Sequence, residues 1–171
     1  MSDLTIQHAG STITAPDGAD SQSARIIRVT PTLVPGDPTA YGAADVLVNP
    51  TEIPKAVNTR GGCSELVGIS ILDQADQGVD MDIIFMQVAK DLGTENAVVD
   101  ISDDNAQAAK FIGSVKVDFS QGLVSLVDSK FCSVKSYRSE TASNPFPMLL
   151  QAEANSTSVY FGVIILSLIH I

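Results

Sequence analysis

The chain has 171 residues, of which 44% are hydrophobic and 18% are charged, with 20 Asp and Glu against 10 Lys and Arg. A chain of this length buries about 70% of its unfolded surface when it folds as one domain, and its apolar content excludes an intrinsically disordered protein. The net charge of -10 argues against nucleic acid and anionic membranes as partners, because phosphate groups repel an acidic surface.

The first residues have the composition of a flexible arm. Residues 10–24 (GSTITAPDGADSQSA) are small and polar, and such a segment cannot bury enough apolar surface to order by itself. We therefore expect an arm over residues 1–24 and a single β-sandwich domain over residues 25–171. The opening MSDLTIQHAG has neither the basic nor the apolar region of a secretory signal, so we expect synthesis in the cytoplasm.

The domain is expected to consist of short strands. β-branched residues and period-two alternation mark ARIIRVTPTLV as an edge strand interrupted by Pro31, and ADVLVNP as a short strand. Residues 64–73 (SELVGISILD) and 79–88 (VDMDIIFMQV) alternate around the polar turn QADQG, which predicts a β-hairpin. Further strands are expected in KVDFSQGLVSLV, in SKFCSVKSYRS and in two parts of LLQAEANSTSVYFGVIIL. Because helical crossovers are missing, the pattern predicts an antiparallel β-sandwich of jelly-roll type.

The stretch DISDDNAQAAKF has two possible interpretations. An EF-hand calcium loop needs Gly at its sixth and Glu at its twelfth position, where this chain has Asn105 and Phe111. A helix start fits better, because Ser102 is a favourable N-cap and two aspartates follow in the first turn. With Gly113 as the end signal, the sequence predicts one short α-helix over residues 102–112.

A second acidic group surrounds the turn after residue 73. It contains Asp73, Asp76, Asp80 and Asp82. Hard cations bind such oxygen clusters, but turns also select Asp, because its side chain accepts hydrogen bonds from nearby backbone amides. We assign the group to turn chemistry, expect no metal or cofactor, and keep these four residues as the candidate metal ligands.

Catalysis is not expected from the residue inventory. Ser-His-Asp or Cys-His chemistry needs a histidine held beside the nucleophile, and the two histidines, His8 and His170, lie near the chain ends. The spacing of Cys63 and Cys132 matches no zinc motif, so we expect two buried, reduced and unpaired thiols. The sequence therefore favours a protein that is not an enzyme.

Three stretches carry a resemblance to a known group of proteins. They read AYGAADVLVNPTEIPKAVNTRGGCSELVGISILDQADQGVDMDIIFMQ, LGTENAVVDISDDNAQAAKFIGSVKV and NPFPMLLQAEANSTSVYFGVII. Together, over residues 25–166, the chain resembles small β-rich structural proteins of tailed bacteriophages, many of them marine. Its landmarks contain no catalytic motif, so no active-site residue is transferred. The ending after Leu166 (LSLIHI) departs from the pattern, in which another strand follows.

The resemblance implies a place in the virion. A capsid cement or decoration protein made in the host cytoplasm is the expected function, with the major capsid protein and neighbouring copies of itself as partners on the capsid surface. A tail or fibre component with a receptor- or carbohydrate-binding role is the alternative. Three tyrosines and no tryptophan are few aromatic residues for a sugar-stacking surface. A small hydrolase is a third hypothesis, which the residue inventory disfavours.

Overall fold

The computed structural model describes residues 26–33, 41–119, 123–135 and 146–166. The chain divides into two compact units, Met1–Thr30 and Pro31–Ile171. Residues 1–24, where the arm is expected, lie outside the described residues. The expected edge strand in ARIIRVTPTLV is not found, because residues 26–33 form neither helix nor strand. Pro31 contributes to this outcome, since it has no backbone N–H for a ladder.

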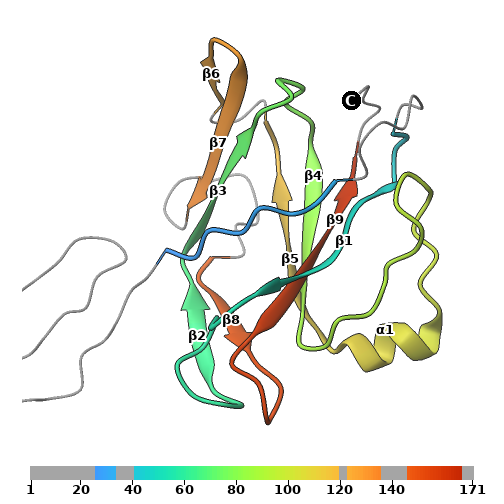
Figure 1. Cartoon of the computed structure of the whole chain (residues 1–171), viewed down its shortest axis with the longest axis vertical. Helices are drawn as coiled ribbons and strands as arrows, with labels where there is room; N and C mark the ends of the chain where they lie inside the picture. The colour runs from blue at the N-terminus through green and yellow to red at the C-terminus, as the bar shows by residue number, and fades with distance from the viewer. Residues whose placement is uncertain (1–25, 34–40, 120–122, 136–145, 167–171) are drawn as a thin grey trace, which may run out of the picture. The chain divides into compact units, whose positions relative to one another are not determined.

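The second unit is mainly β, as predicted, and its sheets are antiparallel (Figure 1). One short helix, α1 (Asp103–Ala109), occurs among the described residues. The strands are β1 (Val46–Ile53), β2 (Cys63–Leu66), β3 (Gly68–Asp73), β4 (Met81–Met86), β5 (Phe111–Val117), β6 (Leu123–Leu126), β7 (Ser129–Lys135), β8 (Met148–Gln151) and β9 (Val159–Ile165).

The strands form three sheets whose neighbours are mostly distant in sequence. One sheet has four strands in the order β1-β9-β4-β5, a second pairs β2 with β8, and a third has the order β3-β7-β6. The hairpin predicted from residues 64–73 and 79–88 is therefore wrong, because β3 pairs with β7 whereas β4 pairs with β5 and β9. The two strands predicted near the end of the chain exist as β8 and β9, but they belong to different sheets.

The single strand expected over residues 64–73 is divided into β2 and β3 at Val67. Leu66 and Ile69 both pack against the larger core described below. Side chains alternate between the two faces of a strand, so residues three apart in one regular strand point to opposite faces. Leu66 and Ile69 both point inward, and the alternation must therefore be interrupted between them. The chain meets this requirement by leaving one sheet at Leu66 and entering another at Gly68.

The predicted start of the helix is confirmed and its predicted end is wrong. The side chain of Ser102 accepts a hydrogen bond from the Asn105 amide, as an N-cap does. The helix ends at Ala109, where Lys110 takes a left-handed conformation with φ of 52°. Gly113 lies inside β5 opposite Phe85 of β4. The pairing of β5 with β4, which begins at Phe111, ends the helix before Gly113 is reached.

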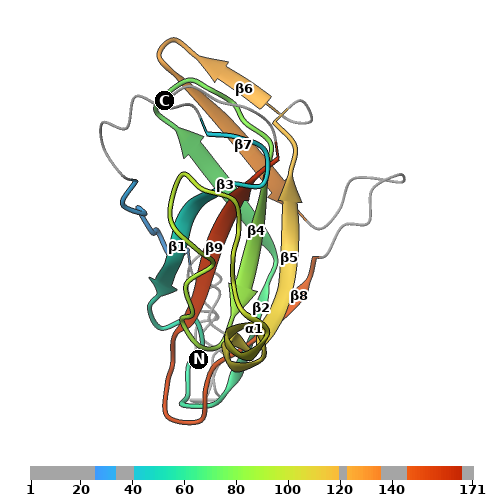
Figure 2. The same cartoon turned by 90° about the vertical axis from the view of Figure 1, so that its right-hand side faces the viewer.

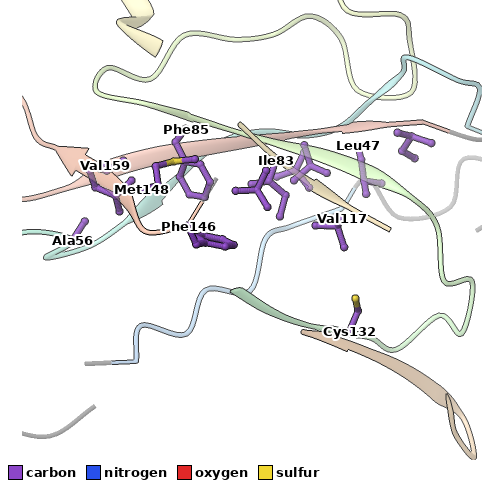
Figure 3. Packing of buried hydrophobic residues seen from close by; sticks show 14 of the residues in the cluster. Leu47, Ala56, Ile83, Phe85, Val117, Cys132, Phe146, Met148 and Val159 are labelled. Carbon is purple, nitrogen blue, oxygen red and sulfur yellow. The ribbon is translucent and has the colours of Figure 1, made fainter. Parts of the chain in front are cut away.

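The larger hydrophobic core draws side chains from all three sheets (Figure 3). Ile83 and Val117 come from the four-stranded sheet, Cys132 from β7 and Met148 from β8. Other members are Tyr41, Leu47, Val48, Ala56, Val57, Val79, Phe85, Val115, Phe119, Phe146, Leu150, Ala152, Val159, Val163 and Ile165. Burial of these apolar side chains is the main stabilising contribution available to a chain of this size.

A second, smaller core covers the other face of the four-stranded sheet. It consists of Val46, Met86, Leu92 and Ala109, and so joins β1 and β4 to the segment 87–102 and to α1. Figure 2 shows this segment in front of β9 and β4. The four-stranded sheet thus contributes side chains to both cores, while Ser114 and Lys116 of its edge strand β5 remain exposed.

The side chain of Asn49 holds the segment 87–102 against β1. Its Oδ1 accepts a hydrogen bond from the Leu92 amide at 3.0 Å, and its Nδ2 donates to the Gly93 carbonyl at 2.8 Å. The Asn49 amide donates to Glu95 Oε1 at 3.3 Å. These bonds satisfy backbone groups of a segment that is not part of a ladder, as buried polar groups require.

Candidate functional site

Asp73 fastens the turn that follows β3. Its Oδ1 accepts a hydrogen bond from the Ala75 amide at 2.9 Å, and its Oδ2 accepts from the amides of Gln77 at 2.8 Å and Gly78 at 2.7 Å. The turn contains two left-handed residues, Asp76 and Gly78. Both carboxylate oxygens are thus occupied by the backbone, which is the turn chemistry expected of an Asp at this place.

The other three acidic candidates have separate surroundings. The carbonyl of Asp76 accepts a hydrogen bond from Lys130 Nζ at 2.6 Å, and the carboxylate of Asp76 lies 3.7 Å from the same nitrogen. Asp80 Oδ1 accepts from the Phe119 amide at 2.9 Å. Asp82 lies in β4, opposite Lys116 of β5. In the part of the chain that the structure describes, no three His, Cys, Asp or Glu side chains gather as metal ligands would.

The two thiols differ in exposure. Cys63 is exposed in β2 and Cys132 is buried in β7, and both are free. The expectation that both are buried is therefore wrong for Cys63, which lies opposite the exposed Gln151 of β8 on the outward side of its sheet. Burial raises the pKa of the Cys132 thiol, and the negative charge of Asp118 raises it further. A thiol held in its protonated form is a poor nucleophile.

A serine and a glutamate meet where β1 and β9 pair. Ser158 Oγ donates a hydrogen bond to Glu52 Oε1 at 2.6 Å, and the Ser158 amide donates to Ser156 Oγ at 2.9 Å. A serine nucleophile is normally activated by a histidine. The described residues include no histidine, since His8 and His170 both fall outside them. The pair lies at the end of the β1–β9 ladder, where Glu52 is opposite Tyr160.

Exposed apolar side chains gather on the outward faces of the two smaller sheets. In β8, Met148 and Leu150 point into the core, whereas Leu149 is 59% exposed. Leu72 of β3 is 54% exposed, and Val67, at the junction between β2 and β3, is 63% exposed. We call Val67, Leu72 and Leu149 the outer apolar surface. A contiguous patch of exposed large apolar side chains marks an interaction surface, and these three residues are the candidates for such a patch.

The strand β6 adds a second exposed apolar group. Leu123, Val124 and Leu126 are 39–50% exposed, and Val127 in the following turn is 95% exposed. We call these four residues the β6 edge. Val124 lies opposite Phe131 of β7, which in turn lies opposite Leu72 of β3. This cross-strand row connects the β6 edge to the outer apolar surface.

Comparisons of the chain with family models, with curated proteins and with solved structures find no match. Among the described residues, no helix has the length and apolar character to cross a membrane. Several of its acidic and hydroxyl groups, including Asp73, Asp80 and Ser102, accept hydrogen bonds from backbone amides. The described residues also carry exposed apolar side chains and an open edge at β6.

Proposed function

We propose that the protein is a non-enzymatic structural component of a tailed-phage virion, and most directly a cement or decoration protein of the capsid. The observation that carries this proposal is the outer apolar surface of Val67, Leu72 and Leu149 on a β-rich body. The resemblance of residues 25–166 to phage structural proteins supplies the partner class. Binding a shell needs contact area and needs no catalytic group.

We also propose that the sheets pack as an antiparallel β-sandwich of jelly-roll type, in which the two smaller sheets face the four-stranded sheet. The support is the larger core, which takes Met148 from β8, Cys132 from β7 and Ile83 from β4. In such an arrangement the outward faces of the smaller sheets lie on the side away from the core. The outer apolar surface is then available to a shell.

The mechanism is mass action. A protein that binds only the mature lattice stabilises that lattice by RT ln(1 + [L]/Kd), and many copies on one particle add avidity. The arm over residues 1–24 pairs along the sheet edge of a neighbour when it docks, and this pairing offsets its loss of conformational entropy. The net charge of -10 keeps the free protein soluble and away from the packaged nucleic acid.

Co-sedimentation with purified mature shells tests the proposal. The full chain should pellet with shells, and the variant Leu72→Glu/Leu149→Glu should bind at least about tenfold more weakly, because two charges replace apolar contact area. Val98→Glu is the matched control, since Val98 is 61% exposed but belongs to the segment 87–102. Deletion of residues 1–24 should weaken binding and leave the melting temperature of the free protein nearly unchanged.

Binding to two other samples distinguishes a place on the capsid from a place in the tail or fibre. Tail tubes and immobilised host glycans are offered to the same protein in parallel with shells. If shells ignore the full chain and tail tubes or a glycan retain it, the cement function is wrong and the receptor-binding role takes its place.

A further inference from the structure

The strand β6 has an exposed edge without charged residues, although the protein is acidic. Its sequence LVSL has no charged residue, all four of its residues are exposed, and β7 is its one strand partner in the described part of the chain. Val127, next in the chain, is the most exposed large apolar residue there. Edge strands are normally protected from other chains by charges, proline or bulges. An uncharged and apolar edge is a template for pairing.

We propose that β6 pairs antiparallel with β6 of a second copy, about a two-fold axis at Ser125. With the axis at this residue, Val124 lies opposite Leu126 of the second copy, and Leu123 lies toward the turn that contains Val127 of the second copy. The two outward apolar residues of β6 thereby each meet an apolar residue. The strand is self-complementary, as a two-fold interface requires.

The faces of the two sheets also match in this register. Leu123 lies opposite the buried Cys132, whereas Val124 lies opposite Phe131 on the outward side. Because side chains alternate along a strand, Leu126 shares the outward side with Val124. The row Leu72, Phe131 and Val124 is therefore continued by Leu126 of the second copy, and the two three-stranded sheets become one sheet of six strands.

The charge distribution favours a second copy as the occupant. Two chains of net charge -10 repel each other, so contact between copies costs least where charge is absent. The five positions 123–127 carry none, and Asp128 follows immediately after them. Like charges placed directly opposite across a ladder would oppose pairing, and this register places none. The inference does not depend on the proposed capsid function, because it concerns the free protein.

Sedimentation equilibrium of the full chain tests the pairing. The protein should be a dimer, and Val124→Lys/Leu126→Lys should raise the dimer dissociation constant at least about tenfold, because like charges then face each other. Val124→Glu/Leu126→Glu should dissociate in the same way. An equimolar mixture of the two variants should form a heterodimer, which also shows that both are folded. Leu149→Lys, at a residue of similar exposure in β8, should leave the dimer unchanged.

Cysteine cross-linking tests the register. In a Cys63→Ser background, Ser125→Cys places two thiols on the axis, where antiparallel Cα atoms lie about 4.5–5.5 Å apart and a disulfide can form. Val124→Cys alone places its two thiols on diagonal positions and should cross-link poorly, but it should cross-link when mixed with Leu126→Cys, which lies directly opposite. A full chain that stays monomeric at all concentrations, or a dimer that the lysine variant leaves intact, would overturn the proposal. If the unchanged chain is monomeric and the lysine variant also loses its binding to shells, the β6 edge is instead a contact with a shell subunit.

Discussion

Asp73 illustrates how much of the acidic character of the chain serves the backbone. Its carboxylate accepts three amide hydrogen bonds, from Ala75, Gln77 and Gly78. Asp73→Ala should lower the free energy of unfolding by about 1–3 kcal/mol, because these amides lose their acceptor. Asp76→Asn is the control and should cost less than about 1 kcal/mol, since Asn tolerates the left-handed conformation of this position and the exposed carboxylate makes only a long ion pair. Urea unfolding measures both, and equal losses would contradict the role assigned to Asp73.

Chelation tests whether the acidic group around this turn binds a metal ion. If the carboxylates of the turn serve backbone amides, then EDTA should leave the melting temperature of the protein nearly unchanged. A decrease of more than about 5 °C corresponds to a loss of at least about 1 kcal/mol. Such a decrease would contradict the turn assignment and revive the interpretation of the acidic groups, with Asp73, Asp76, Asp80 and Asp82 among them, as a cation site.

The two cysteines should react with alkylating reagents at very different rates. Cys63 is exposed, whereas Cys132 is buried and has a raised pKa. Mass spectrometry of the native protein at pH 8 should show fast addition of one group at Cys63, with the second added only on unfolding. Rapid modification of Cys132 in the native state would contradict its burial.

The raised pKa of Cys132 also sets a direction for stability against pH. Its contribution is complete below the ordinary thiol value of 9.0 and is lost as the pH rises through the higher value of the folded state. Urea unfolding between pH 8 and pH 10 should therefore show a decrease in stability on the alkaline side. Cys132→Val should make that decrease smaller, and an unchanged pH dependence would count against the burial of the thiol.

At the scale of elements, Gly162 sets how closely the segment 87–102 approaches β9. A Cβ atom at this position would lie 2.6 Å from Leu92 Cδ1 and 3.3 Å from the Val48 carbonyl oxygen. Leu92 is fully buried, and a Cβ at this position would displace its side chain within the smaller core, so Gly162→Ala should cost about 1–3 kcal/mol. Gly113→Ala is the matched control in β5, where the nearest atom, at 3.1 Å, is the flexible end of Met148. Denaturant unfolding should rank Gly162→Ala as the more damaging change, and the reverse order would contradict this packing.

Local sequence chemistry was sufficient to predict the bounds of some elements and insufficient to predict those of others. The start of α1 follows from Ser102 and the acidic first turn, because an N-cap acts within a few residues. The end of α1 does not follow from Gly113, because it depends on where β5 meets β4. Pairing partners were not predictable either: several alternating segments fit one another equally well, and the ladder of β3 with β7 joins residues far apart in the chain.

Local sequence patterns also did not predict which apolar residues are exposed in the candidate surfaces. Alternation in β8 shows that Leu149 and Met148 point to opposite sides, but it does not tell which side is buried when both residues are apolar. The same holds for Leu123 and Val124 in β6. Only the positions of the sheets around the larger core decide these cases. The division between β2 and β3 is reflected in one spacing: Leu66 and Ile69, which pack against the same core, are three residues apart, whereas residues on one face of a strand are two or four apart.

At the scale of the whole molecule, side chains such as Asp73, Asp80 and Asn49 stabilise turns and loops, and most of the exposed large apolar residues lie in or next to the two smaller sheets. This distribution suits a protein that acts by binding. Cement proteins differ from other binding proteins in one respect, because their binding must stabilise the partner lattice. The stability of the shell is therefore more informative than attachment alone.

The most direct measurement is the thermal disruption of mature shells, followed by calorimetry with increasing amounts of the protein. We expect the disruption temperature to rise with concentration and to level off when the sites are full, because a ligand of the intact lattice stabilises it by mass action. The variant Leu72→Glu/Leu149→Glu should need a higher concentration to produce the same rise, and Val98→Glu should behave like the unchanged protein. A disruption temperature that stays constant while the protein is bound to the shells would contradict the cement function.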